Sequence, residues 1–100
     1  MRGLSNSNGM EMPVAFTGIS VPTSFWEADE TYVDYPFRAS VALEGVTEDF
    51  APSVTFAPTE ALSGVFAPVA ASYDGGVYIY AAEKPEATLN ILGILCIPVG

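Results

Sequence analysis

The chain has 100 residues, of which 50% are hydrophobic and 15% charged, so its composition is that of one globular domain rather than a disordered segment. Three basic residues against twelve acidic ones give a net charge of -9, which disfavours nucleic acids and anionic membranes because they carry the same sign. The absence of histidine and the single cysteine, Cys96, exclude an internal disulfide, Cys/His zinc sites and histidine-based acid/base catalysis.

The ends of the chain give no sign of a membrane or secretory segment. The N-terminus has no apolar stretch of secretory length, and the apolar tail from Ile91 to Val99 is shorter than the roughly 20 residues that span a bilayer. We therefore expect no signal peptide, no membrane insertion and synthesis in a cytoplasm. Cys96 lies in an alternating apolar run, so we expect it to be a small, buried hydrophobic side chain.

The N-terminal part predicts an extended arm. Residues 1–11 are polar and rich in Gly, Ser and Asn, a composition without a core of its own. We divide the chain into an extended N-terminal arm, 1–18, and a single β-sandwich domain, 19–100. Met12–Val21 reads as a short extended piece in which Gly18 interrupts the alternation. A turn at Pro22–Ser24 then leads to Trp26, expected in the core, and to an acidic stretch.

The strongest pattern in the middle of the chain is strict alternation. Every second residue from Tyr35 to Leu43 is apolar or aromatic (YPFRASVAL), which predicts a strand with one buried face. A turn at Gly45–Asp49 and a short return strand at Ser53–Phe56 follow. Thr59 and Glu60 could open one helical turn, but the glycine and proline that follow prevent a longer helix.

The C-terminal part predicts a hairpin and a closing strand. Tyr73–Gly76 is a tight turn in which both glycines are expected to take positive φ, and Val77–Ala81 is the outgoing strand. The segment from Leu89 to Val99 is apolar on both faces, so we expect it to be covered on both sides. Together these segments predict an all-β, antiparallel β-sandwich or small barrel with at most one short helical turn.

Few residues in the chain could carry chemistry. The acidic group Glu27, Asp29, Glu30 and Asp34 could bind calcium, but its spacing matches no calcium-loop motif, and a solvated acidic loop is the simpler interpretation. Paired carboxylates could also serve a small hydrolase, which would need them at a set separation in a cleft. We expect no catalytic residues, no cofactor and no metal.

The aromatic residues are the candidate binding residues. They could stack against sugar rings as a carbohydrate-binding module does, or lie at an interface or in ordinary packing, which we favour. Tyr78 and Tyr80 should face opposite to Val77, Ile79 and Ala81 on their strand. The candidates are Trp26, Tyr32, Tyr35, Tyr73, Tyr78 and Tyr80.

The order of several short segments resembles a known kind of viral domain. These segments are Trp26, Tyr35–Ala39 (YPFRA), Val41–Thr47 (VALEGVT), Pro52, Phe56, Gly75–Ala81 (GGVYIYA) and Lys84–Pro85. They resemble the small β-domains at the C-terminal ends of bacteriophage tail-fibre, baseplate and head-fibre proteins of phages that infect Firmicutes. The resemblance covers about residues 19–98 and brings no catalytic motif.

The resemblance implies a structural role on a virion. It implies a β-sandwich, commonly a trimer, that contributes to fibre assembly, to decoration of the capsid or tail, or to attachment to the host surface, including its glycans. The expected partners are other copies of the chain and other capsid, tail or baseplate proteins. No long fibre shaft precedes the module in this sequence, so a decoration subunit fits as well as a fibre.

Overall fold

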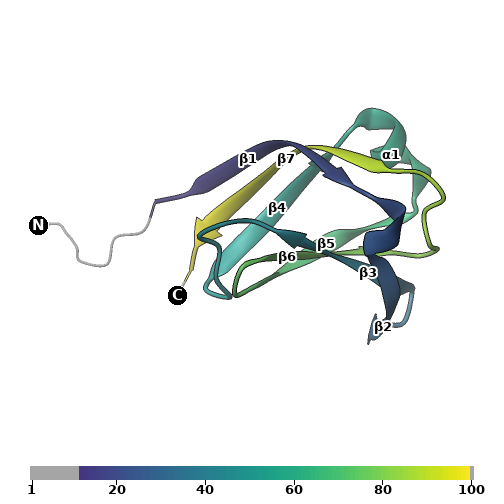
Figure 1. Cartoon of the computed structure of the whole chain (residues 1–100), viewed down its shortest axis with the longest axis horizontal. Coiled ribbons are helices and arrows are strands. Elements are labelled where there is room, and N and C mark those ends of the chain that lie inside the picture. The colour runs from purple at the N-terminus through teal and green to yellow at the C-terminus, as the bar shows by residue number, and fades with distance from the viewer. Residues whose placement is uncertain (1–11, 100) are drawn as a thin grey trace, which may run out of the picture.

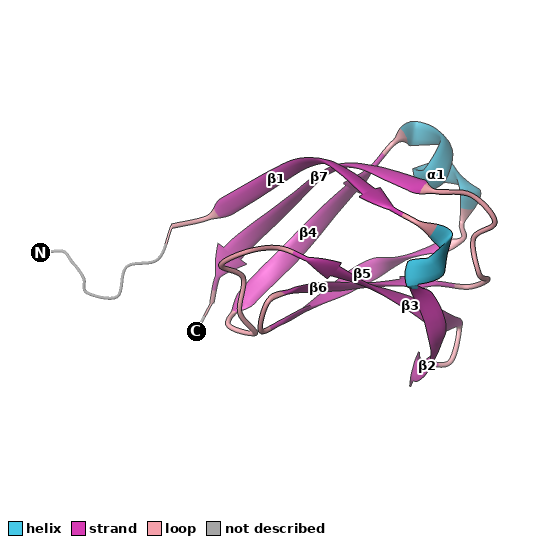
Figure 2. Ribbon diagram, viewed as in Figure 1, coloured by secondary structure: helices cyan, strands magenta, loops and turns pink. Residues whose placement is uncertain are grey.

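Two antiparallel sheets packed face to face make up the structure, a computed structural model that describes residues 12–99 (Figures 1 and 2). One sheet has the strand order β1-β7-β4, and the other the order β2-β3-β6-β5. The predicted all-β sandwich is confirmed. The strands are β1 (Val14–Val21), β2 (Trp26–Tyr32), β3 (Tyr35–Ala42), β4 (Phe50–Phe56), β5 (Phe66–Tyr73), β6 (Gly76–Ala81) and β7 (Leu89–Pro98).

Strand β1 begins before the predicted domain boundary. It pairs with β7 from Val14, opposite Cys96, to Val21, opposite Leu89, so placing residues 14–18 in a separate arm was wrong. Gly18 has a φ of 62°, and the inward alternation changes phase there: Phe16 packs on the core before it and Ile19 and Val21 after it, while the register with β7 is unchanged. Residues 1–11, the rest of the predicted arm, lie outside the described residues.

The core lies between the sheets and is built from the inward-facing residues of their strands. Val77, Ile79 and Ala81 of β6 are buried, and Ile91, Ile94 and Cys96 of β7 face them from the other sheet. Trp26 is buried too, with its ring 6.0 Å from that of Phe66. Its Nε1 has no hydrogen-bond partner in the part of the chain that the structure describes.

Two strands occupy segments for which no strand was predicted. The acidic stretch forms β2, an edge strand paired with β3, and β5 lies in the ambiguous segment before the hairpin. Strand β4 begins at Phe50, three residues before the predicted return strand. The only helical elements among residues 12–99 are the 3-10 turn η1 (Thr23–Phe25) and the short helix α1 (Pro58–Ser63), which ends at Gly64 with a φ of 76°.

The turn before β6 differs from its prediction at one glycine. Gly75 has a φ of 120°, as expected, but Gly76 does not have a positive φ. At Gly76 space is the constraint: a Cβ there would overlap the carbonyl oxygen of Val41 and lie 2.7 Å from the Tyr73 hydroxyl. Glycine is therefore required because β3 and β6 approach each other closely.

Candidate functional site

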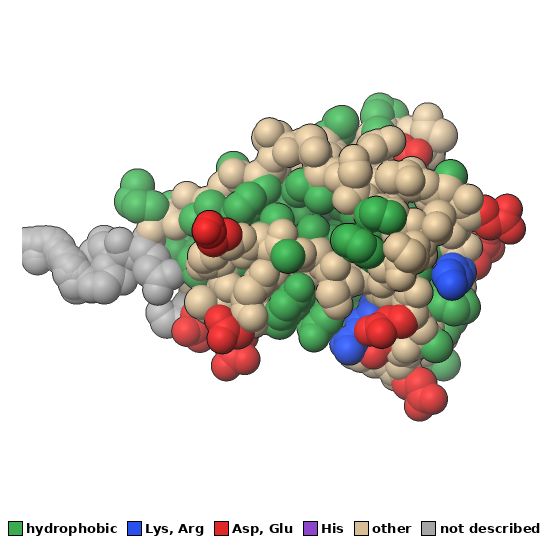
Figure 3. Space-filling view, viewed as in Figure 1, with side chains coloured by type: hydrophobic (Ala, Val, Ile, Leu, Met, Phe, Trp, Pro, Cys, Tyr) green, Lys and Arg blue, Asp and Glu red, His purple; other side chains and the backbone are tan. Residues whose placement is uncertain are grey.

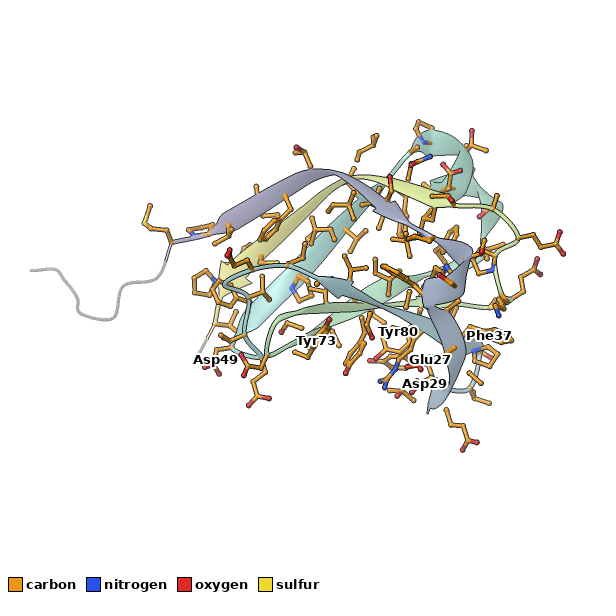
Figure 4. The ribbon with its side chains drawn as sticks, in the orientation of Figure 1. Glu27, Asp29, Phe37, Asp49, Tyr73 and Tyr80 are labelled. Carbon is orange, nitrogen blue, oxygen red and sulfur yellow. The ribbon has the colours of Figure 1, made fainter. Side chains whose placement is uncertain are left out.

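The outer face of the four-stranded sheet carries a polar and aromatic cluster around Arg38. The Arg38 guanidinium lies between two carboxylates of β2, with Nε 3.4 Å from Glu27 and an Nη 3.3 Å from Asp29. Its Cζ lies 4.0 Å from the centre of the Tyr78 ring. Figure 4 shows Glu27, Asp29 and Tyr80 together below this sheet. Arg38 therefore joins β2, β3 and β6 by charge and by a cation–π contact.

Four tyrosines complete this cluster. Tyr73 of β5 stacks on Tyr78 with ring centres 4.5 Å apart, and Tyr32 packs edge-on against Tyr80 at 4.8 Å. Since β3 and β5 flank β6 on opposite sides, Arg38 and Tyr73 cover opposite faces of the Tyr78 ring. The rings therefore cover one another, and the cluster is not the open, coplanar platform on which sugars stack.

The cluster contains only part of the predicted aromatic set. Tyr78 faces opposite to the core residues of β6, as expected, and Tyr80 on the same side is only 2% exposed. Trp26 points into the core, so its inclusion among the candidate ligand-facing aromatics was wrong, whereas its expected place in the core is confirmed. Tyr35 lies opposite Tyr32 at the β2–β3 turn and follows the inward alternation of β3. Arg38 was not among the candidates.

Hydrogen bonds and Arg38 organise the acidic stretch. The Asp29 carboxylate accepts a hydrogen bond from the Thr31 N–H at 2.9 Å, and the hydrogen bonds from Thr31, with a smaller effect of Arg38, hold its pKa below the usual value of 3.8. Glu30 and Asp34 are exposed. Within residues 12–99 no group of three acidic or cysteine side chains is close enough to hold a metal ion.

The outer face of the three-stranded sheet has the opposite character. Strands β1, β4 and β7 contain no Asp, Glu, Lys or Arg. The middle strand exposes Leu92 by 53%, Leu95 by 41% and Ile97 by 43%. We call this surface the uncharged face. Its exposed side chains are those of Ala15, Thr17, Ser20, Ala51, Ser53, Thr55, Asn90, Leu92, Leu95 and Ile97.

Strand β7 is thus covered differently from the prediction. Its inner side chains are buried against the other sheet, whereas its outer side chains are not covered by the described residues of the same chain. Within residues 12–99, the expectation that β7 is covered on both sides is therefore wrong. Figure 3 shows acidic side chains at several places on the surface, among them the lower side and the right-hand end of the molecule.

Three clefts in the described part of the chain are places where a small molecule could bind. The first, about 280 Å³, opens between the edges of β4 and β5; Phe56, Phe66 and Ile79 line it, and Glu60 is its single ionisable side chain. One carboxylate cannot perform the paired acid/base chemistry of glycoside hydrolysis. The second is a more open hollow of about 360 Å³ beside α1 and residues 83–89. The third, about 350 Å³, lies at the β2–β3 turn, where Asp29, Glu30 and Tyr32 line it. None of the three brings Tyr73, Tyr78 or Arg38 to its wall.

Comparison with models of known protein families, with characterised proteins and with solved structures finds no match to this chain. None of the helices described in residues 12–99 has the length and apolar character needed to cross a membrane.

Proposed function

We propose that this chain is a non-enzymatic structural protein of a bacteriophage particle, a fibre or appendage subunit or a decoration subunit of the capsid or tail. It acts through contacts between β-domains, and its partners are further copies of the chain and neighbouring virion proteins. The resemblance of residues 19–98 to small phage β-domains motivates the viral part of this proposal.

The uncharged face is the observation that carries the structural part. In a chain with a net charge of -9, a whole sheet without charged residues, with three exposed large apolar side chains on its middle strand, has the composition of a protein interface. A surface of this kind can pack against a neighbouring subunit. The acidic remainder of the surface keeps closely packed copies from aggregating further.

The contacts of Tyr78 argue against sugar stacking on that ring. Both faces of the Tyr78 ring are occupied by Arg38 and Tyr73, so that ring has no face left for a pyranose ring.

Quantitative mass spectrometry of purified phage particles tests the proposal. We expect the chain in the particles at many copies, in fixed ratio to a major capsid or tail protein, and retained after a high-salt wash. Its absence from particles in lysates where it is abundant would overturn the proposal. Calorimetric titration of the purified chain with cell-wall glycans tests the carbohydrate alternative, for which we expect no heat of binding.

A further inference from the structure

We propose that the uncharged face binds a second copy of this chain, so that the β1-β7-β4 sheets of two copies pack against each other. This inference rests on the proposed structural function and names the partner of its interface. It follows from where the charges lie, from the shape of the face and from the properties of the other surfaces.

The charges select this face for contact between identical chains. Each copy has a net charge of -9, so two copies repel each other wherever their acidic surfaces meet. On the outer face of the four-stranded sheet, Glu27 and Asp29 of one copy would approach those of the other. The uncharged face brings no charged side chain of its own strands into the contact. A basic partner, in contrast, would gain most from the acidic surfaces and nothing from this face.

The shape of the face suits close packing. Leu95 lies between Ala15 on β1 and Ser53 on β4, and Ile97 lies beside Ala51. Large apolar side chains on the middle strand, flanked by small ones, form a ridge whose flanks leave room for the ridge of a neighbour. Side chains of this kind lose contact with water at little entropic cost, because leucine and isoleucine have few rotamers to lose.

The size of the face sets the expected strength. Three strands about 4.8 Å apart and seven to ten residues long make a face of roughly 25 to 30 Å by 15 Å. Its flat area is about 400 Å² per copy, without the extra surface of the protruding side chains. Two such faces bury about 800 Å², less than the roughly 1,200 Å² of stable complexes. We therefore expect association in the micromolar to millimolar range, which is populated where many copies are held close together.

Sedimentation velocity across a concentration series, at low and high salt, tests the inference. We expect a monomer to oligomer shift that strengthens at higher salt, because salt screens the repulsion between copies. Leu95→Glu and Leu95→Lys should both weaken association by on the order of 100-fold, since either variant buries an unpaired charge. Leu62→Glu is the matched control, because Leu62 is 86% exposed and lies on α1, outside the three strands of the face, and it should associate as the parent chain does.

A second substitution separates loss of association from loss of folding. Ser53 is exposed on the edge strand β4, so Ser53→Glu adds a charge to the face and removes no core contact. It should keep the parent's melting temperature and still weaken association. A parent chain that stays monomeric at millimolar concentration would overturn the inference. The inference would also be overturned if Leu95→Glu weakened association while Leu95→Lys strengthened it, because opposite effects of the two charges would indicate an electrostatic contact.

One further outcome would also overturn face-to-face packing. If association persists in Leu95→Glu and hydrogen exchange slows only at the free edge of β1, the copies pair edge to edge. The test is independent of the virion proposal: a monomeric chain found in particles refutes only the self-association, whereas a self-associating chain absent from particles refutes only the virion role.

Discussion

Replacing Gly76 by alanine should strongly destabilise the fold, although the residue lies in an ordinary strand conformation. The new Cβ would overlap the Val41 carbonyl oxygen and lie 2.9 Å from the Val41 carbonyl carbon. Ordinary carbon–carbon contacts are about 3.5 to 4.0 Å, so β3 and β6 would have to separate by about 1 Å. Neighbouring hydrogen bonds resist this movement, because Gly75 bonds to the backbone of Leu43 and of Val46, each at 2.8 Å.

The size of the effect follows from this geometry. Overpacking of a well-packed site costs about 1 to 3 kcal/mol, and weakening the two adjacent backbone hydrogen bonds adds about 1 kcal/mol for each bond lost. We expect a loss of about 3 kcal/mol in the free energy of unfolding. For a domain of this size, that corresponds to a fall in the melting temperature of about 12 to 24 °C.

Thermal unfolding followed by circular dichroism measures this loss, with Gly93→Ala as the control. A Cβ at Gly93 would have only the Phe16 carbonyl oxygen nearby, at 3.4 Å, so this variant should match or slightly exceed the parent's melting temperature. If Gly76→Ala melts within about 5 °C of the parent, the close approach of β3 and β6 does not exist in the folded protein, and the reasoning fails.

Three further predictions concern single side chains. Burial raises the pKa of the Cys96 thiol above its usual 9.0, so it should resist alkylation in the folded chain and react fully in denaturant; labelling without denaturant would contradict its burial. Burial, and next Tyr78, raises the pKa of Tyr73 above 10.0; the folded state then holds this proton longer than the unfolded state, so its stability contribution is present below about pH 10 and lost as pH rises further. In urea unfolding measured across that pH range, the free energy of unfolding of Tyr73→Phe should fall less steeply with pH than that of the parent chain. Equal slopes would refute the assignment. Arg38→Gln removes two partly exposed ion pairs and the contact with the Tyr78 ring, so the free energy of unfolding in urea should fall by about 1 to 2 kcal/mol. An unchanged free energy of unfolding would show that the cluster does not stabilise the fold.

The strands that the sequence predicted well are those whose alternation reflects burial on one side. Strands β3 and β6 are interior strands of their sheet, and their apolar residues recur with a period of two. Strands β2 and β5, which were not predicted, are the two edges of that sheet. Edge strands carry charges and prolines that prevent pairing with other chains, here the acids of β2 and Pro68 of β5. The same residue types are typical of loops, so sequence alone does not separate the two.

The aromatic cluster shows the same limit at the level of side chains. The period of β6 placed Tyr78 and Tyr80 opposite to the core side chains, but it could not show what covers them. Tyr73 reaches Tyr78 because β5 pairs with β6, and Arg38 reaches it because β3 pairs on the other side. These contacts depend on the order and register of strands that are far apart in the chain. Arg38 was therefore missed, although it is one of only three basic residues.

The uncharged face depends most of all on topology. Its strands come from three separate segments of the chain, β1, β4 and β7, and each segment taken alone reads as an ordinary apolar strand. The sheet becomes free of charge only because β7 lies between β1 and β4, while the acidic β2 and the arginine of β3 are placed in the other sheet. The fold thus divides an acidic chain into a charged layer and an uncharged one. Two copies that contact each other through their uncharged layers bring the fewest like charges together. The distribution of charge that keeps copies apart in dilute solution therefore also determines which surfaces can be in contact when copies are crowded.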